Sequence, residues 1–181
     1  MIHMRNFLSI ACFLLFLTNS CCLLADPSIL NFSNKVVVDG SELVLNGQAM
    51  RRASIFRVKV YAMGLYLEEK ESDARKIIES RTRKFIKMKV LRDLSVEELV
   101  EAWTGGIVDN YPDYRVVQKE LQIYNNAMIP VKKGDEFTLF FDKDTLELAL
   151  NNKGSLKIKS NKFQEALLSI CLLYTSPSPR D

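Results

Sequence analysis

Histidine and cysteine are scarce in this sequence of 181 residues. There is one histidine, His3, and there are four cysteines, at positions 12, 21, 22 and 171. The long segment 26–170 contains neither type, so it can form no disulfide and no zinc site of cysteine and histidine ligands. It cannot carry a Ser-His-Asp or Cys-His nucleophile either. Any chemistry in this segment must come from arginine, lysine, tyrosine, carboxylates and the backbone.

Glycine and proline are also few, and the charge is nearly balanced. Seven glycines and five prolines exclude collagen-like and low-complexity chains. A net charge of +3, spread along the chain, gives no electrostatic footprint for nucleic acid. The sequence shows no phosphate loop, dinucleotide fingerprint or metal-ligand spacing, so we expect no cofactor and no metal. With 48% hydrophobic and 26% charged residues, the chain fits one ordinary folded domain.

The first 25 residues have the pattern of a secretory signal peptide. Arg5 supplies a positive charge, and residues 7–17 (FLSIACFLLFL) form an apolar run too short to span a bilayer comfortably. Cleavage is expected after Ala25, and a cut after Cys22 remains open. A lipid anchor on one of the two adjacent cysteines and an uncleaved membrane anchor are the alternatives. We therefore expect a periplasmic or secreted protein with no membrane span in its mature form.

The last residues, 171–181 (CLLYTSPSPRD), break from a helical pattern into alternating serine and proline. They look like the translation of a common sequencing adapter, so we expect the natural protein to differ from about Ile170 onward. A natural Ser/Pro tail is the alternative. The expected organisation is a signal peptide at 1–25, one domain at 26–170 and an adapter-derived tail.

Hydrophobic periodicity predicts an alternation of strands and helices along the domain. Strands are expected at residues 35–38, 42–45, 55–68, 85–91, 136–142, 146–151 and 155–159, with turns at 39–41 and 46–47. Helices are expected at 72–81, between Ser95 and Pro112, at 115–128 and from Phe163 onward, the first of them capped by Ser72. The second and third of these helices each carry an apolar stripe at helical spacing: Val96, Leu99, Val100, Trp103 and Ile107 in one, and Val117, Leu121, Tyr124 and Met128 in the other.

The order β-β-β-α-β-α-α-β-β-β-α predicts the α+β class, because short turns join the strands at both ends of the domain. We expect one antiparallel sheet with helices packed on one face. The other face carries Arg57, Lys59, Lys87 and Lys89, which suits exposure to solvent. Gly64 in the middle of a strand suggests a bulge or a close approach to the backbone.

Arg51 and a nearby tyrosine are the candidates for ligand binding. Arg51 is expected at a turn-to-strand junction, where a fixed guanidinium can clamp a carboxylate or an enolate oxygen. Tyr61 and Tyr66 have opposite parity on one strand, so only one of them is expected to face a pocket and donate a hydrogen bond to a carbonyl. The alternative for the tyrosines is packing in the core with the hydroxyl at its edge, and for the strand lysines a solvated face.

Trp103 and several methionines could line an apolar ligand cavity or simply fill the core. The methionines are Met50, Met63, Met88 and Met128. Glu97 and Glu98 belong to a helix-capping box that begins at Ser95, which is a better explanation for them than an acid–base pair.

Three stretches of the sequence resemble the bacterial chalcone isomerase-like proteins. They are residues 45–69 (LNGQAMRRASIFRVKVYAMGLYLEE), 84–103 (KFIKMKVLRDLSVEELVEAW) and 131–142 (VKKGDEFTLFFD). The resemblance covers roughly residues 36–170 and implies an open-faced β-sandwich, in which an antiparallel sheet is backed by a helical layer. It also implies an exported protein, and the family normally continues beyond Ile170 through a last helical segment.

The resemblance to plant chalcone isomerases is incomplete at the residues that act on substrate. Those enzymes close a ring without a cofactor, and the arginine that positions the phenolate matches Arg51. The family's strand threonine falls on Tyr61, and its helix tyrosine, lysine and asparagine fall on Leu99, Ala102 and Gly106. One of five polar positions is therefore kept, and most of the donors that would stabilise an oxyanion are missing.

We therefore expect a non-catalytic, monomeric, exported domain that binds a small apolar acid or lipid in a cleft between sheet and helices. Arg51 would clamp the carboxylate, and Tyr61 would assist. The resemblance suggests a fatty acid, because the family includes fatty-acid-binding members. The alternatives are a chalcone isomerase-type intramolecular lyase (an isomerase) that uses Arg51 and Tyr61 on another substrate, and a ligand-free interaction protein of the cell envelope.

Overall fold

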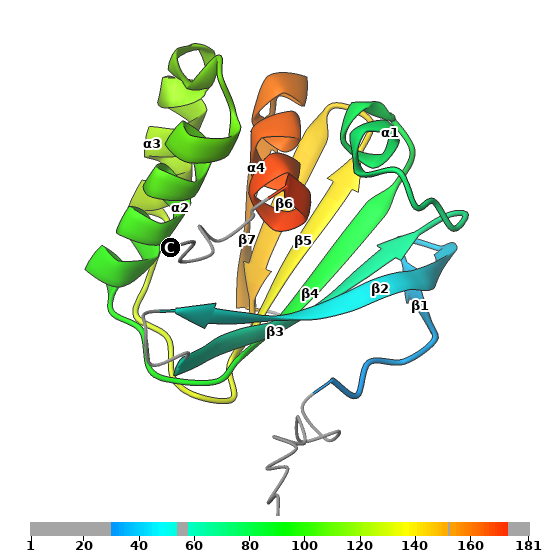
Figure 1. The fold of residues 1–181 in the computed structure, drawn as a ribbon, viewed down its shortest axis with the longest axis horizontal. Coiled ribbons are helices and arrows are strands. Elements are labelled where there is room, and N and C mark those ends of the chain that lie inside the picture. Colours follow the sequence, from blue (N-terminus) through cyan, green and yellow to red (C-terminus); the bar gives the residue numbers. More distant parts are fainter. Residues whose placement is uncertain (1–29, 54–57, 152, 174–181) are drawn as a thin grey trace, which may run out of the picture.

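One antiparallel sheet with all its helices on one side makes up the structure (Figure 1). It is a computed structural model that describes residues 30–53, 58–151 and 153–173. The elements follow in the order β-β-β-α-β-α-α-β-β-β-α, with a 3-10 turn before the third helix. The predicted α+β class and order of elements are thereby confirmed.

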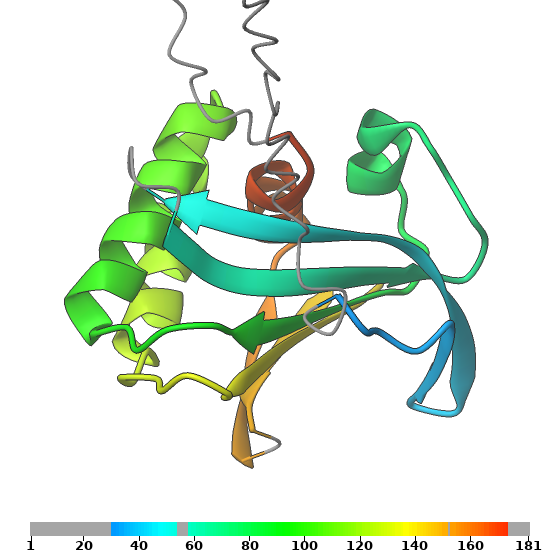
Figure 2. The same ribbon diagram turned by 60° about the horizontal axis from the view of Figure 1, so that its bottom comes forward.

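Seven strands form the sheet, and each is hydrogen-bonded to its neighbours in the sequence. They are β1 (Lys35–Val38), β2 (Ser41–Ala53), β3 (Val58–Leu67), β4 (Lys84–Val90), β5 (Glu136–Asp142), β6 (Thr145–Leu150) and β7 (Lys153–Lys159). Among the described residues every strand pairing is antiparallel. The sheet is curled, so the long strands β2 and β3 cross the direction of β5 to β7 (Figures 1 and 2).

The helical layer has α4 at its centre. Its elements are α1 (Ala74–Glu79), α2 (Val96–Asn110), the 3-10 turn η1 (Tyr114–Val117), α3 (Gln118–Asn126) and α4 (Asn161–Leu173). α4 packs against α1 on one flank and against α2 and η1 on the other, and α2 and α3 lie side by side (Figures 1 and 2). The two flanks of α4 therefore join different parts of the layer.

Apolar side chains form two separate clusters, one on each face of the sheet. The main core lies between the sheet and the helices and contains the stripes predicted for α2 and for the η1–α3 segment. The smaller cluster lies on the other face and is built from Phe32, Leu43, Ala62 and Tyr66. The prediction of a solvent-exposed second face was therefore wrong for this part of the sheet, because β1, β2 and Phe32 bury it.

Two of the basic residues predicted on that second face make specific contacts. Lys87 pairs with Glu136 at 2.9 Å. The Nζ atom of Lys89 lies 5.0 Å from the centre of the Phe32 ring and donates to the backbone oxygen of Asn31. Arg57 lies outside the described residues. Lys87 and Lys89 are thus half-buried and partnered rather than simply solvated.

Strand β2 is longer than predicted, because the chain does not turn at Asn46 and Gly47. The strand runs through both residues, with a register shift between Leu45 and Gly47 that marks a bulge. The Asn46 side chain exchanges two hydrogen bonds of 2.9 Å with the backbone of Glu71, which fixes the segment before α1. The predicted turn was therefore wrong, and its Asn-Gly pair forms a bulge that anchors a distant loop.

Strand β3 carries the predicted glycine contact. A Cβ atom on Gly64 would lie 2.9 Å from the ring of Phe32, so only glycine allows Phe32 to close the small cluster. The close approach is confirmed, although it is to a side chain rather than to backbone. Residues 55–57 of the predicted strand lie outside the described residues.

The helix ends follow capping chemistry. Ser95 and Glu98 form the predicted capping box at the start of α2, with reciprocal hydrogen bonds of 3.2 and 3.0 Å. The prediction of Ser72 as the first cap was wrong: α1 begins one residue later, and the side chain of Asp73 accepts from the backbone of Arg75 and Lys76.

The last helix extends beyond the predicted boundary at Ile170. α4 runs to Leu173, and Cys171 and Leu172 pack against the main core. Two residues of the predicted tail, Cys171 and Leu172, are therefore part of the packed fold. The predicted signal peptide at 1–25 and the last residues of the tail lie outside the described residues. No helix among the described residues combines the length and apolarity needed to cross a bilayer.

Candidate functional site

Arg51 and Tyr61 are direct neighbours across strands β2 and β3. Their Cα atoms are partners in the antiparallel register. Residues opposite each other in such a pair point to the same face of the sheet, and Tyr61 packs against the main core. Arg51 therefore belongs to the helix-facing side, where it is half-buried. The predicted pair is brought together, although Arg51 lies within a strand and not at a turn-to-strand junction.

A second register shift occurs beside this pair. Arg51 is opposite Tyr61 and Arg52 is opposite Lys59, so Val60 is the extra residue of a bulge in β3. Val60 consequently joins the main core, whereas strict alternation along an unbulged strand would place it on the face of Ala62. Bulges of this kind re-aim side chains next to ligand sites. Tyr66 faces the small cluster on the other side, so Tyr61 is the tyrosine of this strand that faces the helices.

The predicted apolar lining divides between the two faces. Trp103, Met63, Met88 and Met128 are all buried in the main core. Met50 is opposite Ala62, which belongs to the small cluster, so it does not join them. The main core that Tyr61 packs against therefore includes one indole and three thioethers among its apolar side chains.

Three aromatic rings from three helices contact one another edge to face within the main core. The Trp103 and Tyr124 rings have centroids 5.6 Å apart and are nearly perpendicular, and the Tyr124 and Phe163 rings are 5.5 Å apart. Tyr124 is completely buried and Trp103 is 7% exposed. Among the described residues, neither the Trp103 Nε1 atom nor the Tyr124 hydroxyl has a hydrogen-bond partner. Two donors thus stand unpaired in an apolar core, which is uncommon in folded proteins.

Burial also determines the protonation state of two groups, the Tyr124 hydroxyl and the Cys171 thiol. Desolvation raises the pKa of the Tyr124 hydroxyl well above its ordinary value, with smaller contributions from Cys171 and Tyr61. Burial raises the pKa of the Cys171 thiol to about 12. Both groups therefore stay protonated at neutral pH, and Cys171 and Tyr61 lie close enough to Tyr124 to affect its pKa. Sequence reasoning misses this group, because the sequence places Tyr124 only in the apolar stripe of a predicted helix and Cys171 in the predicted tail.

The positions of α2 that are polar in the isomerases, by the resemblance, carry no polar side chain in this chain. Leu99 is buried in the core and Ala102 is exposed. A Cβ atom on Gly106 would lie 2.9 Å from Cγ2 of Ile170, so the close packing of α4 fills the place of a longer side chain. The donors that would polarise a ketone at these positions are therefore absent, and an apolar wall takes their place.

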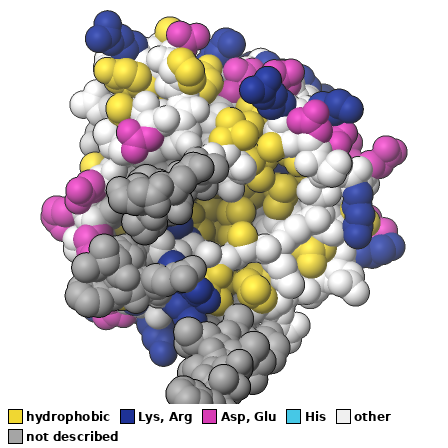
Figure 3. All heavy atoms as spheres, in the orientation of Figure 1, with side chains coloured by type: hydrophobic (Ala, Val, Ile, Leu, Met, Phe, Trp, Pro, Cys, Tyr) yellow, Lys and Arg dark blue, Asp and Glu magenta, His cyan; other side chains and the backbone are white. Residues whose placement is uncertain are grey.

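The site brings a guanidinium and a phenol together at the edge of an apolar core. One guanidinium and one phenol stand at its border, and the described residues contain no group of three or more His, Cys, Asp and Glu side chains that could hold a metal ion. Apolar side chains gather in the middle of the molecular face where α4 approaches β2 and β3, and charged groups surround them (Figure 3). An apolar molecule with an acidic head group matches this arrangement.

Two surface grooves lie apart from Arg51 and Tyr61. One, of about 260 Å³, is bordered by α1, the end of α2 and the end of α4, and includes Tyr111 and Leu173. The other, of about 430 Å³, lies on the far face of the sheet and includes Phe85, Phe140 and Lys157. Neither contains a residue that sequence reasoning selected for binding, and both are open to solvent.

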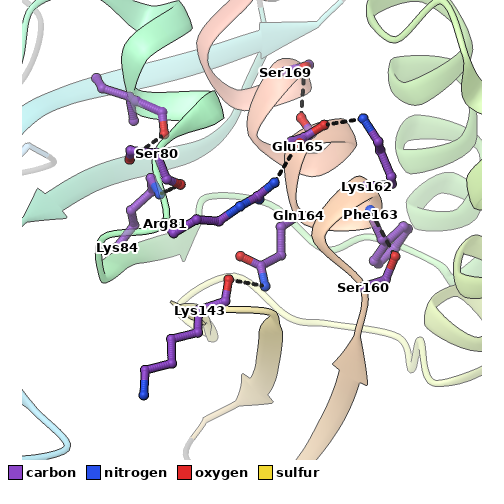
Figure 4. Close-up of polar contacts among 11 residues, drawn as sticks. Ser80, Arg81, Lys84, Lys143, Ser160, Lys162, Phe163, Gln164, Glu165 and Ser169 are labelled. Atoms are coloured by element: carbon purple, nitrogen blue, oxygen red, sulfur yellow. Dashed lines mark hydrogen bonds and ion pairs between the residues drawn. The ribbon is translucent and has the colours of Figure 1, made fainter.

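A polar contact region joins α1 to α4 and was not predicted (Figure 4). The buried Lys84 donates from Nζ to the backbone oxygens of Ser80 and Thr82 at 2.8 and 3.1 Å. Nearby, the Glu165 carboxylate forms ion pairs with Arg81 at 2.9 Å and with Lys162 at 3.3 Å. Lys84 occupies the helix-facing parity of β4, and that alternation was the available signal for its burial.

Comparisons with known proteins agree on the fold. A family model described as chalcone isomerase-like matches residues 28–178. Among solved structures, the fatty-acid binding protein AtFAP1 of Arabidopsis thaliana is similar, with a TM-score of 0.59 and 16% sequence identity. The alignment covers 74% of this chain and 86% of that protein. The search of curated proteins found no match.

Proposed function

The chain belongs to the chalcone isomerase-like family, and from this premise we propose that it binds a small apolar carboxylate, such as a fatty acid, without acting on it chemically. The observation that carries the proposal is the cross-strand pair of Arg51 and Tyr61 at the border of the main core. A guanidinium offers a carboxylate two parallel hydrogen bonds, and a phenol can add a third. The apolar side chains of the main core next to them match an acyl chain in polarity.

Two further observations favour binding over catalysis. Leu99, Ala102 and Gly106 provide no donors where the resemblance to the isomerases would require them, and preorganised donors are the main source of rate in oxyanion chemistry. The similar Arabidopsis thaliana structure is described as a fatty-acid binding protein. A binding function uses the residues that remain, whereas ring closure needs groups that this chain lacks.

We also propose that the protein acts outside the cytoplasm and is a monomer. Arg5 and the apolar run at 7–17 support export. Mass spectrometry of the protein from a host that expresses the full chain should find an N-terminus near Asp26. An intact N-terminus on protein from the cytoplasmic fraction alone would contradict this part of the proposal.

Calorimetric titration of palmitic acid into delipidated protein tests the binding function. Arg51→Ala should weaken binding about 5- to 100-fold, the range for losing a charge-assisted hydrogen bond. Arg51→Lys should recover only part of the loss, because an ammonium cannot form the bidentate contact. Arg52→Ala is the matched control: it removes the same charge one residue along the strand, from the other face, and should leave the affinity nearly unchanged.

The same protein should be given a chalcone as substrate. We expect no cyclisation above the uncatalysed rate. Equal palmitic acid affinities in the wild type and all three variants would show that Arg51 has another role. Turnover of the chalcone would instead support the isomerase.

A further inference from the structure

We propose that Trp103 and Tyr124 form a second polar contact point for the ligand, deep in the main core, and that the preferred ligand is an acyl acid with a carbonyl group along its chain. This inference rests on the proposed function, because it takes the carboxylate to be held at Arg51 and Tyr61. It adds a requirement on the chemistry of the chain that follows the carboxylate.

The observation behind it is the pair of unpartnered donors. Trp103 Nε1 and the Tyr124 hydroxyl are buried, belong to rings in edge contact, and have no acceptor among the described residues. A buried donor without a partner is costly, and folded proteins rarely keep one without a reason such as a bound group. Two of them in one ring contact make a site that is rich in donors and surrounded by apolar atoms.

Nearby polar side chains do not explain the pair. The Asn125 side chain donates to Thr104 Oγ1 at 3.0 Å, and its own Oδ1 atom is unpartnered, so it does not accept from either ring. On the other flank of α4, Gln164 and Ser169 both donate to backbone oxygens. The lack of partners is therefore confined to a few groups and is not general to the polar side chains of the helical layer.

The type of donor decides the type of acceptor. An indole nitrogen can only donate, and desolvation keeps the Tyr124 hydroxyl protonated. A carbonyl oxygen has two lone pairs and no proton of its own, so it can accept from such donors without leaving a proton unpaired. A hydroxyl would bring a further donor into a region that already has too many, and a methylene would leave both donors unsatisfied.

The position of the pair relative to Arg51 supports a continuous site. Tyr124 lies within electrostatic range of Tyr61 and Cys171, and the side chains of both are only partly buried. Tyr61 is in turn the cross-strand partner of Arg51. A ligand with its carboxylate at Arg51 would have its chain on the helix-facing side of β3, where Tyr61 lies within electrostatic range of Tyr124.

The sequence supplies its own reporter, because Trp103 is the only tryptophan. The experiment compares stearic acid with octadecanoic acids that carry one ketone at successive mid-chain positions. Both the affinity and the emission of Trp103 are measured. For one ketone position we expect about tenfold tighter binding than for stearic acid, with a shift in tryptophan emission that stearic acid does not cause.

Tyr124→Phe removes only the hydroxyl and keeps the ring. It should reduce the preference for the keto acid over stearic acid, measured as the ratio of the two affinities for the same variant, to about threefold or less. Tyr114→Phe is the matched control, since Tyr114 is a partly buried tyrosine of η1 with no part in the ring stack, and it should keep the full preference.

The outcomes separate this inference from the proposed function. Equal binding of stearic acid and every keto acid, still sensitive to Arg51→Ala, would overturn the second contact point and leave the first. An ordered water alone at the two donors would give that same equality. Binding of neither acid would overturn both proposals.

Discussion

The two flanks of α4 are built in opposite ways. On the flank that faces α1, polar side chains are paired: Lys84 and Gln164 both donate to backbone oxygens, and Arg81 binds Glu165 (Figure 4). On the flank that faces α2, the helices approach closely at Gly106 and Ile170. There the Trp103 and Tyr124 donors have no partner among the described residues.

This contrast separates buried polar groups that stabilise the fold from buried polar groups that we assign to ligand binding. A buried polar group that has its hydrogen bonds helps to define one arrangement of the fold, and the α1 flank contains such groups. A buried donor that lacks an acceptor lowers stability, and such losses are concentrated at functional sites. The α2 flank is accordingly the side on which we place the ligand, and variants on the two flanks should respond differently.

Lys84→Ala should give the largest effect, a loss of about 3 kcal/mol in the free energy of unfolding. The side chain is 1% exposed, so truncation leaves a cavity and removes the donor to Ser80 and Thr82. Urea unfolding at pH 7 measures the loss. Lys87→Ala, on the same strand but half-exposed, is the control and should cost less than about 1 kcal/mol. Equal losses would show that the contacts of Lys84 are unimportant.

The pH dependence of the free energy of unfolding should reveal the lowered pKa of the same lysine, Lys84. Desolvation, with Arg81 adding to it and Glu68 opposing it, lowers the pKa of Lys84 from its ordinary 10.5 to about 8. Between these values the unfolded state binds more protons than the folded state, so stability rises with pH over this window. Relative to Lys84→Met, the wild type should gain about 2 kcal/mol between pH 8 and pH 10.5. A constant difference between the two proteins would contradict the lowered pKa.

The elements that sequence predicted well depend on local chemistry. The capping box at Ser95 and the apolar stripe behind it defined α2, and short turns defined the last three strands. The predictions were wrong where contacts between residues far apart in the sequence determine the structure. Asn46 looks like a turn residue until its bonds to Glu71 are known, and Lys84 looks like a surface lysine until the backbone oxygens at the end of α1 are in place.

The candidate site divides along the same line. Arg51 and Tyr61 could be selected from residue type and a family resemblance, because a guanidinium and a phenol near each other suggest anion binding. The unpaired state of Trp103 and Tyr124 could not be predicted, because a missing partner is a property of the whole packed core. Spacing in the sequence indicated only that both residues face inward.

Gly106→Ala should lower stability by about 1 kcal/mol and thereby test the close packing on the α2 flank. The new methyl group would lie 2.9 Å from Ile170 Cγ2, and this overlap should outweigh the gain of about 1 kcal/mol in helix propensity. Gly105→Ala is the matched control: nothing lies within 4 Å of its new methyl group, so propensity alone should stabilise the protein. Stabilisation by both substitutions would show that α2 and α4 can separate without cost.

Tyr124→Phe should give the smallest effect and the opposite sign, a gain of about 0.5 kcal/mol in the delipidated protein. Removing a buried hydroxyl that has no partner among the described residues relieves its desolvation cost while the ring contacts with Trp103 and Phe163 remain. Tyr66→Phe is the comparison, because Tyr66 is equally buried but packs in the small cluster on the other face of the sheet. We expect no gain there. Thermal and urea unfolding of both variants, with and without a bound fatty acid, make the measurement. A loss of stability in delipidated Tyr124→Phe would mean that the hydroxyl already has a partner when no ligand is bound, and the contrast between the two flanks of α4 would then not hold.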